Sequence, residues 1–553
     1  MKKAVLTLLA SILVACQQAK TQINRPTPLP QDPFVEVYFN HDRSSEYVEP
    51  YRRQRRSGDD LEQVIVDTIN TAQSTVDVAV QELRLPKIAK ALAEKKKAGV
   101  KVRVILENSY SRPWSKLTSD EIAKLPEREK GRYQEFIKLV DQNRDNQLSA
   151  EEIDRGDAIV ILQKADIPII DDTADGSKGS GLMHHKFVII DRNTLIITSA
   201  NLTTSDTHGD FNHLSSLGNA NNLLKIESSQ LAYLFTEEFN IMWGDGPNGQ
   251  PDSKFGIQKP LRPAQQIIEG NNNIEVQFSP TSPTKPWEES SNGLIGKTLN
   301  LASRSVNIAL FVFSEQRLVN MLENHHQKGV QIRALIDPDF AYRPYSEALD
   351  MMGVALPNNC KYEPDNRPWQ DPISTVGIPQ LLKGDLLHHK FGVVDSKIVI
   401  TGSHNWSVAA NANNDETVLV IQNPTVAAHF DREFERLYSN AILGLPERIK
   451  QKIQAQQKQC PVTSILPTTV SIKNKLEFKT PPQPNIDNLG GQKININTAS
   501  QQELESLPGV GPKLAQEIIK ARQQKPFTSL EDLDNVPGVG PSLLEKLKER
   551  VTW

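Results

Sequence analysis

Short runs of alternating apolar and polar positions recur along this chain, and they come twice in the same order. Residues 35–39 and residues 274–278 each alternate like a half-buried strand. After each of them follows a helical pattern, a strand, a second helical pattern and a second strand. The later strands cover residues 75–80 and 100–106 in the first half and residues 305–312 and 330–336 in the second. The second helical pattern contains residues 91–92 in the first half and residues 318–322 in the second. The repeated order predicts an α/β fold of two homologous domains, each a mixed, largely parallel sheet flanked by helices.

Changes in composition mark the boundaries of these domains. A chain of 553 residues is too long for one hydrophobic core. A polar, proline-rich stretch precedes the first strand, and a Gln/Lys-rich stretch followed by a Pro/Thr/Asn segment comes after the second half. We therefore expect a tether at residues 16–33, domains at 34–255 and 270–445, a linker at 446–491 and a small all-α module at 492–553.

The first residues have the pattern of a secretory signal. Two lysines precede an apolar stretch at residues 4–15, which is shorter than the roughly 20 residues that a membrane-spanning helix needs. The stretch ends in Leu13-Val14-Ala15-Cys16, which resembles a bacterial lipobox. That resemblance implies a signal peptide at residues 1–15, lipid attached to Cys16, and a lipid-anchored protein on the periplasmic side of the outer membrane or on the cell surface. An ordinary secreted protein or an uncleaved anchor is the alternative.

Charge and cysteine content add little to this picture. The net charge of −4 gives no bulk attraction to nucleic acid. Beyond Cys16, Cys360 and Cys460 remain for an oxidising compartment, where they either pair or stay as partly buried thiols. We expect a monomer.

One short motif occurs in both halves with identical spacing, and it carries the candidate chemistry. Each copy has a histidine, a lysine two residues later, an aspartate five residues after the lysine, and then a serine and an asparagine. The residues are His184, Lys186, Asp191, Ser199 and Asn201 in the first copy and His388, Lys390, Asp395, Ser403 and Asn405 in the second. Together they offer a nucleophile, a proton donor and cations, which phosphodiester cleavage requires.

This pattern resembles the phospholipase D superfamily, whose members cleave phosphodiesters through a phosphohistidine. The resemblance implies that one histidine attacks phosphorus while the other protonates the leaving oxygen and then activates water. The lysines are expected to bind nonbridging oxygens, with the serines and asparagines as neutral donors, and no cofactor is required. In the family the aspartate is mainly structural. The residues do not decide which histidine attacks, although the family favours His184.

The surroundings of the two histidines differ between the halves. Strand alternation places each motif histidine on the same face as its lysine, whereas His185 and His389 point away. Glu416 occupies the position from which family members orient the second-half histidine. The corresponding stretch of the first half lacks an acid. We therefore expect His184 to be oriented by Asn221 or by a carboxylate from the intervening loop, either Asp206 or Asp210.

An acidic segment distinguishes the first half and lies in an insertion at about residues 133–160. Oxygen-bearing side chains fall at positions 1, 3, 5, 7 and 12 of an EF-hand-like loop: Asp141, Asn143, Asp145, Gln147 and Glu152. Asn146 stands where glycine is usual, and asparagine tolerates the left-handed conformation. Helices are expected at residues 133–140 and from 150 onward. The spacing predicts a structural Ca²⁺ ion, and a solvated Asp/Asn turn is the alternative.

The last sixty residues contain a glycine-rich hairpin twice, at residues 507–515 and 536–544. The pair resembles the helix-hairpin-helix domain of bacterial DNA-uptake receptors. Glycines allow the backbone to approach a phosphate, and the next helix begins there with free N–H groups. The expected DNA contacts are Gly509, Gly511, Lys513, Gly538 and Gly540. The module carries equal numbers of acidic and basic side chains, so protein contact or simple packing is the alternative.

These features together predict an envelope-associated phosphodiesterase that hydrolyses DNA. A phospholipase D that converts membrane phospholipids to phosphatidic acid is the main alternative, favoured by the expected lipid anchor. A DNA-binding receptor with vestigial catalysis is the second alternative, although neither motif copy is damaged.

Overall fold

The computed structural model describes residues 25–177, 181–363, 365–460, 494–499, 510–533, 547–548 and 550–553, together with residues 504, 507, 536, 539 and 544. It divides into two compact units, residues 1–466 and 467–553. The predicted signal peptide and Cys16 lie outside the described residues.

The first half of the larger unit is built on a seven-stranded sheet. Its strands, in spatial order, are β1 (Val35–Phe39), β9 (Asn222–Glu227), β8 (Thr194–Thr198), β7 (Lys186–Ile190), β4 (Thr75–Val80), β5 (Lys101–Leu106) and β6 (Ile169–Asp171). Its helices are α1 (Leu61–Asn70), α2 (Pro86–Lys97), α3 (Ser119–Lys124), α4 (Glu127–Val140), α5 (Ala150–Gly156), α6 (Ala158–Lys164), α7 (Thr204–Thr207) and α8 (Ser229–Trp243), beside a small hairpin of β2 (Glu46–Val48) and β3 (Arg55–Ser57). The central strand β7 is buried along its whole length, which suits its continuous apolar run after Lys186.

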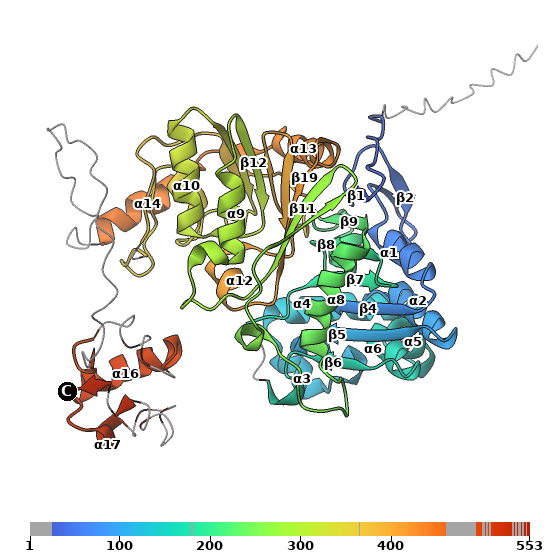
Figure 1. Cartoon of the computed structure of the whole chain (residues 1–553), viewed down its shortest axis with the longest axis horizontal. Coiled ribbons are helices and arrows are strands. Elements are labelled where there is room, and N and C mark those ends of the chain that lie inside the picture. The colour runs from blue at the N-terminus through green and yellow to red at the C-terminus, as the bar shows by residue number, and fades with distance from the viewer. Residues whose placement is uncertain are drawn as a thin grey trace, which may run out of the picture. The chain divides into compact units, whose positions relative to one another are not determined.

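The second half repeats this plan on a nine-stranded sheet. Its strands, in spatial order, are β10 (Gln265–Glu269), β11 (Asn272–Phe278), β19 (Thr417–Gln422), β17 (Ile398–Gly402), β16 (Lys390–Val394), β12 (Ser305–Leu310), β14 (Gln331–Ile336), β15 (Val376–Ile378) and β20 (Ile442–Leu443). Its helices are α9 (Ser291–Leu299), α10 (Gln316–Gln327), α11 (Glu347–Met351), α12 (Val408–Ala412), α13 (Pro424–Tyr438) and α14 (Glu447–Gln459), beside the strand pair β13 (Phe313–Ser314) and β18 (Trp406–Ser407). Figure 1 shows α9 and α10 against this sheet.

Mixed sheets flanked by helices confirm the predicted fold class, but the expectation of largely parallel sheets is wrong. Among the described strands, parallel pairing is confined to β4–β5–β6, β12–β14–β15 and the short pair β13–β18 in this unit. The motif strands β7 and β16 instead turn back at once into β8 and β17. Both central residues of each turn have positive φ, at 50° and 53° for Asp191-Arg192 and 52° and 55° for Asp395-Ser396. The paired strand ends, Ile190 with Thr194 and Val394 with Ile398, are joined by only three residues, and connections this short close antiparallel hairpins.

The two halves share one hydrophobic core. The helices α8 and α13 and the strands β1 and β11 all contribute to the same cluster. Phe39 from the first half packs edge-on against Phe430 from the second, with ring centroids 5.1 Å apart. Phe235 packs likewise against Phe278 at 5.0 Å. The described parts of the two halves therefore fold together as one unit.

The expected tether ends inside this unit, and the expected linker begins inside it. Asp32, at the end of the expected tether, is buried and accepts hydrogen bonds from the side chains of Asn272 and Asn423 at 2.9 Å. Helix α14 lies within the expected linker, yet its Ile449 is buried in the core of the second half. A disulfide joins Cys460, just after α14, to Cys360. The described ends of both segments are thus packed, and residues 461–493 lie outside the described part.

The smaller unit is described only in part. It contains α16 (Pro512–Gln524), α17 (Leu530–Leu533) and a two-strand parallel pair of β21 (Ile494–Asn495) and β22 (Val551–Thr552). Buried Ile518, Phe527 and Leu533 belong to its own apolar core. The helical prediction is confirmed, with the addition of the short strand pair that joins the two ends of the module.

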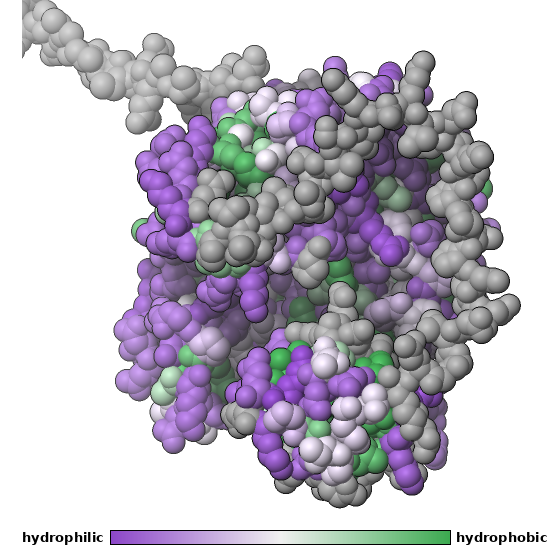
Figure 2. All heavy atoms as spheres, turned by 90° about the vertical axis from the view of Figure 1, so that its left-hand side faces the viewer, coloured by the Kyte–Doolittle hydropathy of each residue, from purple (hydrophilic) through white to green (hydrophobic). Residues whose placement is uncertain are grey.

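Within the described ranges, every helix is too short or too polar to cross a membrane. Hydrophilic side chains predominate among the coloured residues in Figure 2, and apolar ones gather there only in small patches.

Candidate active site

The two motif histidines meet at the junction of the halves because the segments that carry them pair across it. The backbone N–H of His184 donates to the carbonyl of Asp415 at 3.0 Å, and that of His388 donates to the carbonyl of Ala220 at 3.1 Å. The neighbouring residues form parallel bridges, Met183 with Asp415 and Ala220 with Leu387. Each histidine therefore enters its own strand from a segment bound to the other half, and each is almost fully buried.

His184 is held by a carboxylate of the second half. Its Nδ1 lies 2.6 Å from Oε2 of Glu416, which is fully buried and also accepts hydrogen bonds from Ser403 and Asn414. Burial lowers the pKa of His184 to about 4 although Glu416 acts in the opposite direction. Burial alone would raise the pKa of Glu416, but His184, which also donates a hydrogen bond to it, and the nearby His404 and Lys186 hold it at about 2. The prediction that Glu416 orients His388 is wrong, because the pairing crosses the junction.

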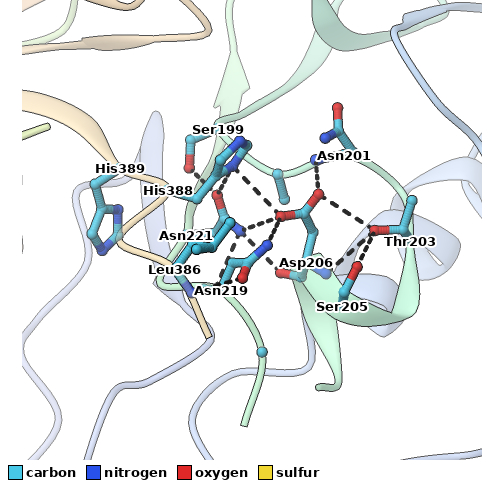
Figure 3. Close-up of polar contacts among 12 residues, drawn as sticks. Ser199, Asn201, Thr203, Ser205, Asp206, Asn219, Asn221, Leu386, His388 and His389 are labelled. Atoms are coloured by element: carbon cyan, nitrogen blue, oxygen red, sulfur yellow. Dashed lines mark hydrogen bonds and ion pairs between the residues drawn. The ribbon is translucent and has the colours of Figure 1, made fainter. Parts of the chain in front are cut away.

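His388 is held in turn by the first half, as Figure 3 shows. Its Nδ1 lies 3.0 Å from Oδ1 of Asn221 and 3.5 Å from Oδ1 of Asp206. Burial, Lys390 and Lys186 keep the pKa of His388 well below its usual value. The prediction that Asn221 or Asp206 orients His184 is therefore wrong, and Asp210 contacts His213 instead, at 2.8 Å.

These contacts fix the hydrogen on each imidazole. Glu416 is ionised and can only accept, so Nδ1 of His184 carries the proton. The Nδ2 group of Asn221 faces acceptors, the carbonyls of Asp206 and Asn219 at 3.0 and 3.2 Å, so its Oδ1 must face His388. Nδ1 of His388 is therefore also a donor. In both rings Nε2 keeps its lone pair for reaction or proton transfer.

The two lysines are buried at the start of their strands. Lys186 and Lys390 are each 1% exposed and donate to the backbone carbonyls of His184 and His388, at 2.9 and 2.7 Å. Burial lowers the pKa of Lys186 to about 8, and burial together with Lys186 lowers that of Lys390 to about 7. A bound phosphodiester anion would favour the charged form of both lysines.

The neighbouring histidines point away from this centre, as the strand alternation predicts. His185 lies between Thr417 at 2.9 Å and Glu238 at 3.0 Å. His389 lies 2.9 Å from Glu433 on α13. Both rings are fully buried, so they help to join the halves.

The serines have a different role from the one predicted. The hydroxyl of Ser199 donates to Oδ1 of Asn221 at 2.7 Å, and that of Ser403 donates to Glu416 at 2.8 Å. Their single protons are thus used to support the groups that orient the histidines. Asn201 and Asn405 remain candidate ligands of the phosphate, for which their Nδ2 groups would be the donors. Their buried Oδ1 atoms make no hydrogen bond in the described part of the protein.

Asp191 and Asp395 do not join the catalytic group. Each follows a strand of five residues, so it lies roughly 16 Å along the chain direction from its lysine. Asp395 accepts the backbone N–H groups of residues 303, 304 and 305, and Asp191 accepts those of residues 73, 74 and 75. Their role is to tie each hairpin turn to the start of the adjacent strand.

Sequence reasoning missed two residues that contact the lysines. The side chain of Gln81 accepts from Lys186 at 3.2 Å, and the Nζ of Lys390 lies 5.0 Å from the ring centre of Phe311. Gln81 directly follows β4 and Phe311 directly follows β12. Aligning the two halves beyond the motif would have brought these positions to attention.

The acidic insertion has the expected helix-loop-helix form. Asp141 accepts the N–H groups of Arg144 and Asn146 at 2.6 and 2.9 Å, and Asn146 has a φ of 61°. Glu152 accepts from the N–H groups of Gln142 and Asn143 and caps α5 together with Ser149. In the described ranges, no three His, Cys, Asp or Glu side chains are gathered as a metal site.

The DNA contacts predicted in the smaller unit are only partly visible. Gly511 is exposed and caps the N-terminus of α16. Lys513 lies in the first turn of that helix. Gly509, Gly538 and Gly540 lie outside the described residues.

Comparison with known proteins places the two repeats and the last module in separate families. The family model described as "Cardiolipin synthase, PLD-like domain" matches residues 65–243 and 295–438. A helix-hairpin-helix motif model matches residues 490–552.

Individual relatives match a smaller part of the chain. A mitochondrial cardiolipin hydrolase of Mus musculus is 32% identical over 155 residues, which are 28% of this chain and 60% of the relative. The corresponding protein of Xenopus laevis is 30% identical over 187 residues, 33% of this chain and 78% of the relative. The chain thus spans about three-fifths of the length of the mouse protein. Among solved structures, the phospholipase D family member Nuc from Salmonella typhimurium is 21% identical, with a TM-score of 0.24, and covers 32% of this chain and all of its own.

Proposed function

The chain belongs to the phospholipase D-like family of phosphodiesterases, and on that premise we propose that it is a nuclease that hydrolyses DNA in the bacterial cell envelope. The observation that carries this choice is the helix-hairpin-helix module joined to the phosphodiesterase unit. Such hairpins offer backbone N–H groups to phosphates without reading the base sequence. Because one chain supplies both histidines, we expect a monomer to be active.

In the proposed mechanism His184 attacks phosphorus and His388 protonates the leaving oxygen. The hydrogen bond from Nδ1 of His184 to the carboxylate of Glu416 raises the electron density at Nε2 and stabilises the positive charge of a phosphohistidine. His388 faces a neutral amide instead. Lys186 and Lys390 neutralise the nonbridging oxygens. After the first product leaves, His388 takes a proton from water, which attacks the phosphohistidine and restores His184.

A phospholipase is the second candidate, and the names of the relatives favour it. The mouse and frog proteins are cardiolipin hydrolases. A lipid at Cys16 would hold the enzyme close to phospholipid phosphodiesters, which present the same chemical group as DNA. The histidine and lysine geometry serves either substrate, so substrate choice depends on features outside this centre.

The deciding experiment offers the purified mature chain, in detergent, three substrates in parallel: plasmid, single-stranded DNA and cardiolipin-containing vesicles. Cleaved DNA with intact lipid supports the nuclease, and released phosphatidic acid with intact DNA refutes it. His184→Ala and His388→Ala should each abolish turnover. Acid-labile phosphate on histidine should be trapped in the wild type and absent from the His184 variant.

Two further features complete the proposal. The oxygen donors of the loop at residues 141–152 suit Ca²⁺, and Asn146 has the turn that such a loop needs. Because Asp141 and Glu152 already accept backbone N–H groups, Ca²⁺ must displace some of these hydrogen bonds. We expect millimolar Ca²⁺ to raise the melting temperature of the wild type but not that of Glu152→Gln. Metabolic labelling with palmitate that is lost in Cys16→Ser would support the lipid anchor.

A further inference from the structure

The two halves of the active site carry a carboxylate at different places. In the second half the acid is Glu416, which contacts His184 directly, and the corresponding position of the first half is the amide Asn221. The helix after each motif asparagine shows the reverse difference. Thr203 caps α7 and Ser407 caps α12, and the residue three positions later is Asp206 in α7 and Ala410 in α12. Each half therefore has one carboxylate near the active site, directly before the strand β19 in the second half and on the short helix α7 in the first.

Asp206 is placed and buried as a supporting group would be (Figure 3). Its side chain is 3% exposed, and Oδ1 accepts hydrogen bonds from the amides of Asn219 at 2.7 Å and Asn221 at 3.3 Å. Oδ2 accepts the backbone N–H of Asn201 at 3.2 Å. Oδ1 also lies 3.5 Å from Nδ1 of His388. The carboxylate therefore joins the second motif histidine to the end of the first motif.

We infer that Asp206 is the positioning carboxylate of His388, acting through the amide of Asn221 and through its own charge. This inference rests on the proposed two-histidine mechanism. Asp206 does not touch the reacting phosphate in this scheme. Its carboxylate accepts from Nδ2 of Asn221 at 3.3 Å, beside the two backbone carbonyls at 3.0 and 3.2 Å, and so helps to keep the Oδ1 of that amide toward the Nδ1 proton of His388.

The charge of Asp206 has a second consequence for proton donation. The other titratable groups that face His388 are Lys390, Lys186, His184 and His389, and all of them disfavour its protonated form. A proton donor surrounded in this way needs a negative neighbour to hold its proton near neutral pH. Asp206 is the carboxylate within 3.5 Å of Nδ1, and a bound phosphodiester adds to its effect.

The test first removes the negative charge of Asp206 and then places a carboxylate at position 221 instead. In Asp206→Asn the kcat for a chromogenic phosphodiester should fall on the order of 10–100-fold with KM changed by less than about twofold. The alkaline limb of the kcat profile should move down by about one pH unit. The double variant Asp206→Asn/Asn221→Asp places a carboxylate directly on His388, so it should recover most of the lost kcat and the original alkaline limb.

Two controls separate this role from a merely structural one. Asp210→Asn removes a nearby acid that contacts His213 rather than His388, and it should leave the pH profile unchanged. A second readout, the titration of ¹³C-labelled histidine by NMR, should show a lower pKa for His388 in Asp206→Asn than in the wild type. This readout requires a folded protein but no turnover.

The outcomes are distinct. A lower kcat with an unchanged alkaline limb, no recovery in the double variant, and an unchanged His388 pKa would overturn the inference and leave Asp206 as a structural residue. A wild type that cleaves neither DNA, lipid nor the chromogenic diester would refute the proposed function, while the NMR titration would still decide the coupling of Asp206 to His388.

Discussion

Replacing Glu416 by glutamine tests the crossed arrangement of the active site most directly. The substitution keeps the shape of the side chain and removes its charge. Three donors point at the carboxylate: His184 and Ser403 at Oε2 and Asn414 at Oε1. The amide oxygen of glutamine should take the Oε2 position, where it satisfies two donors, and its NH₂ group should push the side chain of Asn414 away. The tautomer of His184 is then preserved.

The expected loss follows from the hydrogen bond that changes. A hydrogen bond to a charged group contributes about 1.5–3 kcal/mol, and each 1.4 kcal/mol corresponds to about a factor of ten in rate. Glu416→Gln should therefore lower kcat by about 10- to 150-fold at neutral pH. The carboxylate also raises the pKa of His184, which burial already lowers to about 4. Without it the pKa falls further, so the attacking imidazole stays neutral at lower pH and the acid limb of the variant moves to lower pH.

The assay is steady-state hydrolysis of a chromogenic phosphodiester between about pH 3 and pH 9, which reaches below the wild-type pKa of about 4 for His184. A matched control is Glu433→Gln, which removes the carboxylate from His389 at 2.9 Å. That pair is buried in the same way but points away from the centre, so the control should lose stability and keep the kcat of its folded fraction. A Glu416 variant with wild-type kcat, or with an acid limb that moves upward, would refute the reasoning that this carboxylate supports an attacking His184.

Three other changes test the lysines, the disulfide and the hairpin turn of the second half. Raising the pH from 7 to 9 should increase KM more than it lowers kcat. Lys186 and Lys390, with pKa values of about 8 and about 7, lose their charge in the free enzyme over this range. A KM that stays constant across the pH series would contradict this. Replacing Cys360 and Cys460 by serine removes a disulfide between residues 100 positions apart. The free energy of unfolding, measured in urea, should fall by up to about 4.7 kcal/mol. An unchanged unfolding midpoint would show that the disulfide is not formed. Asp395→Ala should cost about 2–3 kcal/mol of stability through lost hydrogen bonds to three backbone N–H groups, without a change in kcat of the folded protein, as urea melts and active-site titration would report.

The local sequence pattern was sufficient to predict the secondary-structure elements and the reactive side chains. The strands predicted at residues 35–39 and 75–80 correspond to β1 and β4 with the same bounds. Successive side chains of a strand point to opposite faces, so neighbouring residues in the sequence are enough to show the pattern. The same rule placed His185 and His389 away from the centre. Sheet direction could not be obtained in this way. It depends on whether the chain turns back at Asp191 and Asp395 or crosses over by a helix, and turn residues with positive φ signal this only weakly in sequence.

The errors at the active site share one physical cause. Along the sequence, Glu416 follows the second motif histidine and Asp206 follows the first. Each acid was therefore assigned to the histidine of its own half. In the folded protein the segments before β7 and β16 pair across the junction, so each half orients the histidine of the other.

The sequence by itself determined which side chains perform the chemistry, since a fixed spacing along a strand sets which of them share a face. Only the tertiary structure decided which carboxylate serves which histidine. That choice depends on backbone pairing between residues more than 150 positions apart, such as His388 with Ala220, and such pairing is set by the shared core rather than by local sequence.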